Sequence, residues 1–192
     1  MVAGFQLTQA LVSLTYLSVV SRYSVRISLT ISALNGLKLL ACKIQNAFLT
    51  SKCREKLYTG AGPEFGLDRG KMMFITHALY GLKKISASFR SYLAKTLYEL
   101  GYTPTKGDPD IWLLKSVKAD GFQYYEMVLC YVYDVICISD YPMKTMKVIQ
   151  CTFKLKDDKI NEPKDYLCAT LEKMILSDGS QLWSISSAKY VK

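Results

Sequence analysis

The sequence is poor in the residues that build metal sites and repeats. It has one histidine, His77, among 192 residues, and no two of its six cysteines are spaced Cys-x-x-Cys, which excludes a structural zinc quartet. Five prolines and 11 glycines follow no fixed period, which excludes a collagen-like or low-complexity chain. Charged residues are only 21% and hydrophobic residues 50% of the chain, so the composition indicates a globular domain rather than a disordered tail.

Acidic residues are also scarce. Lys and Arg number 25 against 16 Asp and Glu, which gives a net charge of +9, and residues 1–42 contain no acid at all. This excess favours an anionic partner, either nucleic acid or an acidic membrane surface. Solubility alone is an equally good explanation of the charge.

The residues around the cysteines and the uncharged N-terminal stretch indicate the cellular compartment of the protein. Most cysteines have apolar neighbours, as Cys130 and Cys137 do, which favours buried free thiols in a reducing compartment. Residues 1–21 carry no charge, but polar residues interrupt them and the basic start of a signal peptide is missing. We therefore expect an intracellular protein of the cytoplasm or nucleus, neither secreted nor bound to a membrane.

The spacing of apolar residues predicts three helices, which begin near Ser21, Ser86 and Pro142. The first should end at Asn35-Gly36, because such a pair stops a helix. Its apolar stripe consists of Val20, Tyr23, Ile27, Ile31 and Leu34.

Strands alternate with these helices. Residues 123–139 are rich in aromatic and β-branched side chains and are too long for one strand, which predicts a hairpin reversing near Tyr133 and Asp134. A second hairpin is expected around the turn 177–180, and further strands over 37–43 and 110–115. The order β-α-β-β-α-β favours an α+β fold of the split ferredoxin-like type, with an antiparallel sheet and helices on one face.

Two segments could carry chemistry. Asp134 lies between apolar runs, where its carboxylate could hold a metal ion or simply accept the backbone hydrogen bonds of a turn. Gly81, Lys83 and Lys84 precede a predicted helix, where they could hold phosphates or form a solvated basic turn. The 14 tyrosines could stack on bases or pack at sheet edges.

Four segments follow one another at spacings typical of one family: Cys42-Lys-Ile-Gln-Asn-Ala-Phe-Leu49, Ala78-Leu-Tyr-Gly-Leu-Lys83, Ala87-Ser-Phe-Arg90 and Leu129-Cys-Tyr-Val-Tyr-Asp-Val-Ile136. In this order they resemble the reverse transcriptase domain of copia-type retrotransposon polyproteins, and the resemblance covers nearly the whole chain. Shorter supporting matches are Tyr16–Arg26, Gly62–Gly66, Gly101-Tyr102, Asp108–Asp110 and Tyr166-Leu167.

The resemblance implies a polymerase palm with interleaved fingers elements. We expect residues 1–192 to form a single reverse transcriptase domain, truncated in the N-terminal fingers and before most of the thumb. The family's basic tract ahead of Val2-Ala3-Gly4 is missing, and the family's Leu-Gly after the last helix reads Leu167-Cys168.

The departures that matter most concern the metal site. The family holds two Mg²⁺ ions with three aspartates, because hard cations prefer carboxylate oxygens. The resemblance aligns these positions with Lys43, Tyr133 and Asp134, so Asp134 is the one surviving carboxylate. An ammonium group at position 43 repels Mg²⁺ and could pair with Asp134 instead, and we expect no tightly bound metal ion.

Other family positions persist. Phe48 stands where the family's aromatic residue excludes a ribose 2′-hydroxyl, although core packing explains it equally well. Gly81, Lys83 and Arg90 match the segment that lies under template and nucleotide.

The resemblance implies an RNA-directed DNA polymerase domain within a retrotransposon polyprotein. Its implied partners are an RNA or DNA template-primer and the integrase and ribonuclease H domains of the same polyprotein. We expect this chain to be catalytically inactive, because two of three metal ligands are lost. The alternatives are a nucleic-acid-binding remnant without chemistry and a functionless pseudogene product.

Overall fold

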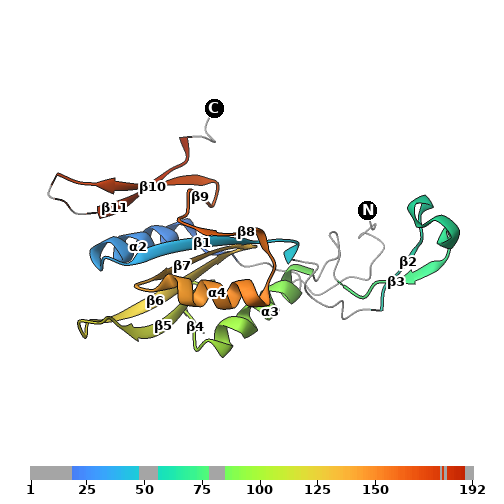
Figure 1. The fold of residues 1–192 in the computed structure, drawn as a ribbon, viewed down its shortest axis with the longest axis horizontal. Helices are drawn as coiled ribbons and strands as arrows, with labels where there is room; N and C mark the ends of the chain where they lie inside the picture. Colours follow the sequence, from blue (N-terminus) through green and yellow to red (C-terminus); the bar gives the residue numbers. More distant parts are fainter. Residues whose placement is uncertain (1–18, 48–55, 78–84, 178, 180, 189–192) are drawn as a thin grey trace. The chain divides into compact units, whose positions relative to one another are not determined.

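The computed structural model describes residues 19–47, 56–77, 85–177, 179 and 181–188 (Figure 1). The chain divides into two compact units, residues 1–17 with 46–94 and residues 18–45 with 95–192. Each unit is described by itself below.

The centre of the larger unit is a six-stranded sheet in the order β4-β5-β6-β7-β1-β8, in which every neighbouring pair is antiparallel. The inner order β6-β7-β1-β8, with helix α3 after β1 and helix α4 after β7, is the split β-α-β-β-α-β arrangement. The predicted antiparallel α+β fold is therefore confirmed. The elements are β1 (Lys38–Ile44), α3 (Ile85–Glu99), β4 (Thr103–Pro104), β5 (Ile111–Val117), β6 (Gln123–Tyr131), β7 (Asp134–Ser139), α4 (Pro142–Thr152) and β8 (Leu155–Asn161).

Helices contact both faces of this sheet, so the expectation of helices on one face is wrong. Helix α2 (Arg22–Leu34) packs through Val25 in one core cluster with Ile136 and Ile138 of β7. Cys137, which lies between Ile136 and Ile138, points to the opposite face of the sheet and interacts with Thr145 of α4. The reason is that residues 135–138 of β7 are apolar and buried on both sides of the strand, so each face needs a cover.

The start of α2 is fixed as the sequence predicts. The Ser21 side chain accepts a hydrogen bond from the Ser24 N–H at 3.1 Å, which caps the helix. The Ser21 N–H donates to Asp108 Oδ2 at 2.9 Å. Burial acts to raise the pKa of Asp108, but hydrogen bonds from Ser21, Ser24 and Asp110 outweigh it and lower this pKa overall.

Helix α2 turns its apolar stripe away from the sheet, except that Val20, which the sequence placed in this stripe, lies before the helix and is buried in the core. Its buried face contains small serines beside two apolar side chains, namely Val25, Ser28, Leu29 and Ser32. Ser28 and Ser32 donate hydrogen bonds to the carbonyl oxygens of Ser24 and Leu37, so their hydroxyls are satisfied without water. The outward residues are Tyr23, Ile27, Ile31 and Leu34.

A three-stranded sheet in the order β11-β10-β9 completes the larger unit. Its strands are β9 (Asp165–Tyr166), β10 (Ala169–Ile175) and β11 (Gln181–Ser186), and the β10–β11 hairpin confirms the one predicted from sequence. Tyr166 and Leu171 join the core cluster that contains α2. Figure 1 shows this hairpin beside α2 and β1.

The smaller unit contains a short antiparallel pair, β2 (Tyr58–Gly60) with β3 (Met72–Phe74). The 3-10 helix η3 (Pro63–Asp68) connects these strands, and an ion pair between Asp68 and Lys71 lies at its end. Across all the described segments, no helix has both the length and the apolar character needed to span a membrane.

Candidate functional site

The β6–β7 hairpin is the first element of the site. Tyr131 pairs with Asp134 and leaves a two-residue loop of Val132 and Tyr133, as the sequence predicts. Val132 has a positive φ of 53°, which such short loops require although a β-branched residue adopts it at a cost. The loop therefore presents Tyr133 and Asp134 at one end of the sheet.

Strand β1 brings Lys43 to the same end. Lys43 is the register partner of Asp134, and the Ile44 N–H donates to the Tyr133 carbonyl oxygen at 2.9 Å. The Lys43 Nζ lies 3.2 Å from Asp134 Oδ1 and 5.3 Å from the centre of the Tyr133 ring. The ion pair anticipated from sequence is thus present, and a cation–π contact joins the third residue to it.

Asp134 is held in an unfavourable environment for a carboxylate. Its side chain is 22% exposed, against 47% for Lys43. Within the described part of the chain, Asp134 Oδ1 has no hydrogen-bond partner of good geometry, and the Lys43 ammonium at 3.2 Å is its charged partner. Burial raises the pKa of Asp134 above its ordinary value of 3.8, and the positive charges of Lys43 and Lys156 offset only part of this rise.

Cys42 lies next to Lys43 on β1 but does not add a reactive group to the site. Burial, followed by the charge of Asp134, raises the pKa of its thiol to about 12. A protonated thiol is neither a nucleophile nor a metal ligand at neutral pH. Cys42 therefore belongs to the core beneath the site.

A groove with a volume of about 470 Å³ opens beside the ion pair. Its other wall is a bulge in β8: Cys42 pairs with Ile160 and Ile44 with Leu155, so four residues project between these pairings. Asp157 at their centre has a positive φ of 57°, as does its neighbour Asp158 at 47°. Four lysines line the groove together with an equal number of acidic residues; the lysines are Lys43, Lys156, Lys159 and Lys164.

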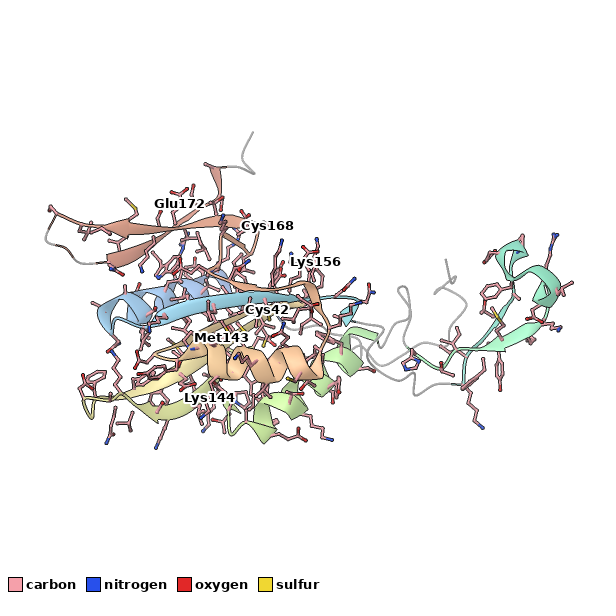
Figure 2. The ribbon with its side chains drawn as sticks, in the orientation of Figure 1. Cys42, Met143, Lys144, Lys156, Cys168 and Glu172 are labelled. Atoms are coloured by element: carbon pink, nitrogen blue, oxygen red, sulfur yellow. The ribbon has the colours of Figure 1, made fainter. Side chains whose placement is uncertain are left out.

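Sequence reasoning missed this second wall. Figure 2 labels Cys42 of β1 and Lys156 of β8, which come from neighbouring strands. The available signal was the sequence Lys156-Asp-Asp-Lys159, because Asp tolerates the left-handed backbone of a tight turn. This segment lies beside Lys43 because β8 pairs with β1, a strand more than one hundred residues earlier in the chain.

The residues at the hairpin do not fit a pair of Mg²⁺ ions. Such ions need several oxygen ligands, mainly carboxylates. Asp134 is the only carboxylate among the three aligned positions, and a lysine ammonium already neutralises it. No cluster of three or more His, Cys, Asp or Glu side chains able to hold a metal occurs in the segments that the structure describes.

The remaining predicted residues are Phe48, Gly81, Lys83 and Arg90. Phe48, Gly81 and Lys83 lie outside the described residues. Arg90 lies half-buried on α3, in residues 85–94 of this helix, which belong to the smaller unit, whereas residues 95–99 belong to the larger one. Roles for these four residues in template or nucleotide binding stay predictions.

Comparison with known families agrees with the resemblance read from the sequence. A model of the family described as reverse transcriptase (RNA-dependent DNA polymerase) matches residues 1–177. This match includes the β6–β7 hairpin, Lys43 and the groove beside them. No curated protein matches the chain.

Proposed function

The chain belongs to the reverse transcriptase (RNA-dependent DNA polymerase) family, and from this premise we propose that it is the reverse transcriptase domain of a copia-type retrotransposon polyprotein whose catalytic centre no longer binds Mg²⁺. In this proposal residues 1–192 are one truncated domain, the six-stranded sheet is the palm, and the β2–β3 hairpin belongs to the fingers. The single observation that carries it is the Lys43 ammonium, 3.2 Å from the one carboxylate left at the site.

The physical argument concerns charge. Two metal ions work by bridging the attacking and leaving oxygens of the phosphoryl transfer, and this requires a negative pocket. Here the pair of Lys43 and Asp134 has no net charge, and Tyr133 offers a neutral phenol. Removal of one electrostatic element from a catalytic site costs a factor of about 10² to 10³ in rate, and two such elements have been replaced here.

Primer extension tests the proposed inactivity. The protein is mixed with a poly(rA) template, an oligo(dT) primer, dTTP and either Mg²⁺ or Mn²⁺. We expect incorporation no greater than that of a blank without protein. Incorporation well above the blank that Asp134→Asn abolishes would overturn the proposal, because it would show that Asp134 supports catalysis.

A gain-of-function variant tests the location of the site. We expect Lys43→Asp combined with Tyr133→Asp to bind Mg²⁺ in calorimetry, because three carboxylates would then meet at the hairpin. The matched control is Lys38→Asp with Tyr141→Asp, since this lysine also lies over a tyrosine ring, at 5.6 Å, at the other end of β1. If the restored variant is folded by circular dichroism but binds no Mg²⁺, the alignment of the metal site is wrong.

A second candidate function is nucleic-acid binding without chemistry. The net charge of +9 favours it, since lysine contacts with phosphates release counterions, although acidic residues balance the four lysines of the groove. We expect affinity for an RNA–DNA duplex to fall steeply with salt and to weaken further in Lys156→Glu, whereas Lys115→Glu, at an exposed position of β5, has a smaller effect. Absence of duplex binding at low salt would remove this candidate.

A further inference from the structure

The outer face of α2 is apolar, and the six-stranded sheet does not cover it. Its four outward residues recur at steps of four, four and three, which is the spacing of one helical face. Ile27 is 60% exposed and Leu34 is 80% exposed. Such an exposed stripe, opposite a face that is already buried, is typical of a helix that packs against a second partner.

An apolar groove runs along the same helix. It lies between α2 and β11 and has a volume of about 690 Å³. Leu29 and Ala33 line it from the helix, and Leu182 and Ile185 line it from β11. Leu34 belongs to both the groove and the outer stripe, so the two surfaces are continuous.

Arg26 is the charged residue of this groove. Among the described residues, no carboxylate lies within ion-pair distance of its guanidinium group. Neither α2 nor β11 contains an acidic residue, and Arg22 stands one helical turn before Arg26. The surface therefore combines apolar contacts at helical spacing with positive charge on one side.

We propose that α2 and β11 form a docking surface for an acidic amphipathic helix of a partner protein. The apolar side of such a helix packs along the stripe and into the groove, and its carboxylates meet the two arginines. This surface shares no lining residue with the groove beside Asp134, so the proposal does not rest on catalytic activity.

Charge and shape favour this occupant over two others. A second copy of the chain would bring arginines to a face without any carboxylate to meet them, and unpaired like charges disfavour association. An anionic membrane would satisfy the arginines, but a flat surface leaves a concave groove unfilled. An amphipathic helix meets both requirements.

Fluorescence anisotropy with two synthetic peptides tests the proposal. The probe is a labelled helix of about four turns, matching the length of α2, with leucines on one face and glutamates on the other; its counterpart carries lysines in place of glutamates. We expect only the acidic peptide, and not its lysine counterpart, to bind and to protect the amides of α2 and β11 from hydrogen exchange. Leu34→Ser should raise its Kd about tenfold, as should Arg26→Glu.

The control variant is Met143→Ser, because Met143 is an exposed apolar residue on another helix, α4. Figure 2 labels this residue. It should leave the Kd unchanged. Equal binding of both peptides, binding of neither, or binding of anionic phosphatidylserine vesicles in place of the peptide would overturn the proposal. Self-association of the chain that Leu34→Ser abolishes would overturn it in favour of a second copy.

Discussion

Replacement of Lys43 by methionine should destabilise the fold at neutral pH, chiefly through Asp134. Lys43→Met keeps most of the apolar stem of the side chain but removes the ammonium group 3.2 Å from Asp134 Oδ1. The carboxylate then remains partly buried at the start of β7 without its nearest positive charge. Because this oxygen has no well-formed hydrogen bond among the described residues, the ion pair is its principal compensation.

The expected loss follows from Coulomb's law. Unit charges 3.2 Å apart interact by about 1.3 kcal/mol in a water-like medium and by about 5 kcal/mol at an effective dielectric constant of about 20. Lys43 is half exposed, so solvent screening keeps the value near the lower limit. We expect the free energy of unfolding to fall by about 1.5 kcal/mol.

The pH dependence has a definite sign. Burial raises the folded-state pKa of Asp134 above 3.8, so the unfolded chain releases this proton first and stability falls as pH rises through the interval above 3.8. Lys43 opposes the rise, and its removal shifts the pKa further upward. The stability lost in Lys43→Met is therefore greatest at pH values above the pKa of Asp134 in the variant. It disappears at lower pH, where Asp134 is protonated in both proteins.

Urea unfolding over a pH series from about 7 to about 4 measures this difference. The control is Lys115→Met, because Lys115 is an exposed strand lysine with no ion pair among the described residues. A double-mutant cycle with Asp134→Asn isolates the coupling between the two groups. The reasoning fails if Lys43→Met costs no more than Lys115→Met, or if its cost does not change with pH.

Two further predictions concern cysteines. Cys168→Gly should raise the free energy of unfolding by about 0.5–1 kcal/mol, because Cys168 has a positive φ of 55° that glycine adopts without strain; Cys151→Gly in α4 should lower it, and equal effects would contradict the argument. Iodoacetamide at neutral pH should modify exposed Cys151 and Cys168 in the native protein and spare Cys42 and Cys137, because burial is the largest cause that raises each of these two thiol pKa values to about 12. Mass spectrometry identifies the modified residues, and native labelling of the buried pair would refute this assignment.

The hairpin at the site was predictable because local and non-local signals agree there. Residues 123–139 are β-rich throughout, and a reversal within them is the simplest way to form two strands. The pairing of Lys43 with Asp134 was not available from composition or periodicity, since it joins residues 91 positions apart. It came from the family resemblance, which supplied the topology that places β1 beside β7.

The orientation of α2 was not predictable from hydrophobic spacing. Its most apolar stripe faces outward, whereas a face with two serines packs on the sheet. Serine hydroxyls that donate hydrogen bonds to backbone carbonyls can be buried without a desolvation penalty. Their small side chains also let the helix lie close to the sheet. A periodicity argument counts apolar residues and cannot register either effect.

Under the proposed function, the fold is retained although two metal ligands are replaced, and the structure gives a physical reason. Backbone hydrogen bonds hold β1 to β7, and buried residues such as Leu39 and Ile136 form the core, whereas positions 43 and 134 lie at the strand ends. Three carboxylates at this point would repel one another, and only a bound cation would relieve that repulsion. Lys43 supplies a positive charge from within the chain, so the strand ends are neutralised without an ion. Under the proposal, the lysine that disables the metal site thereby also frees the hairpin from needing a metal.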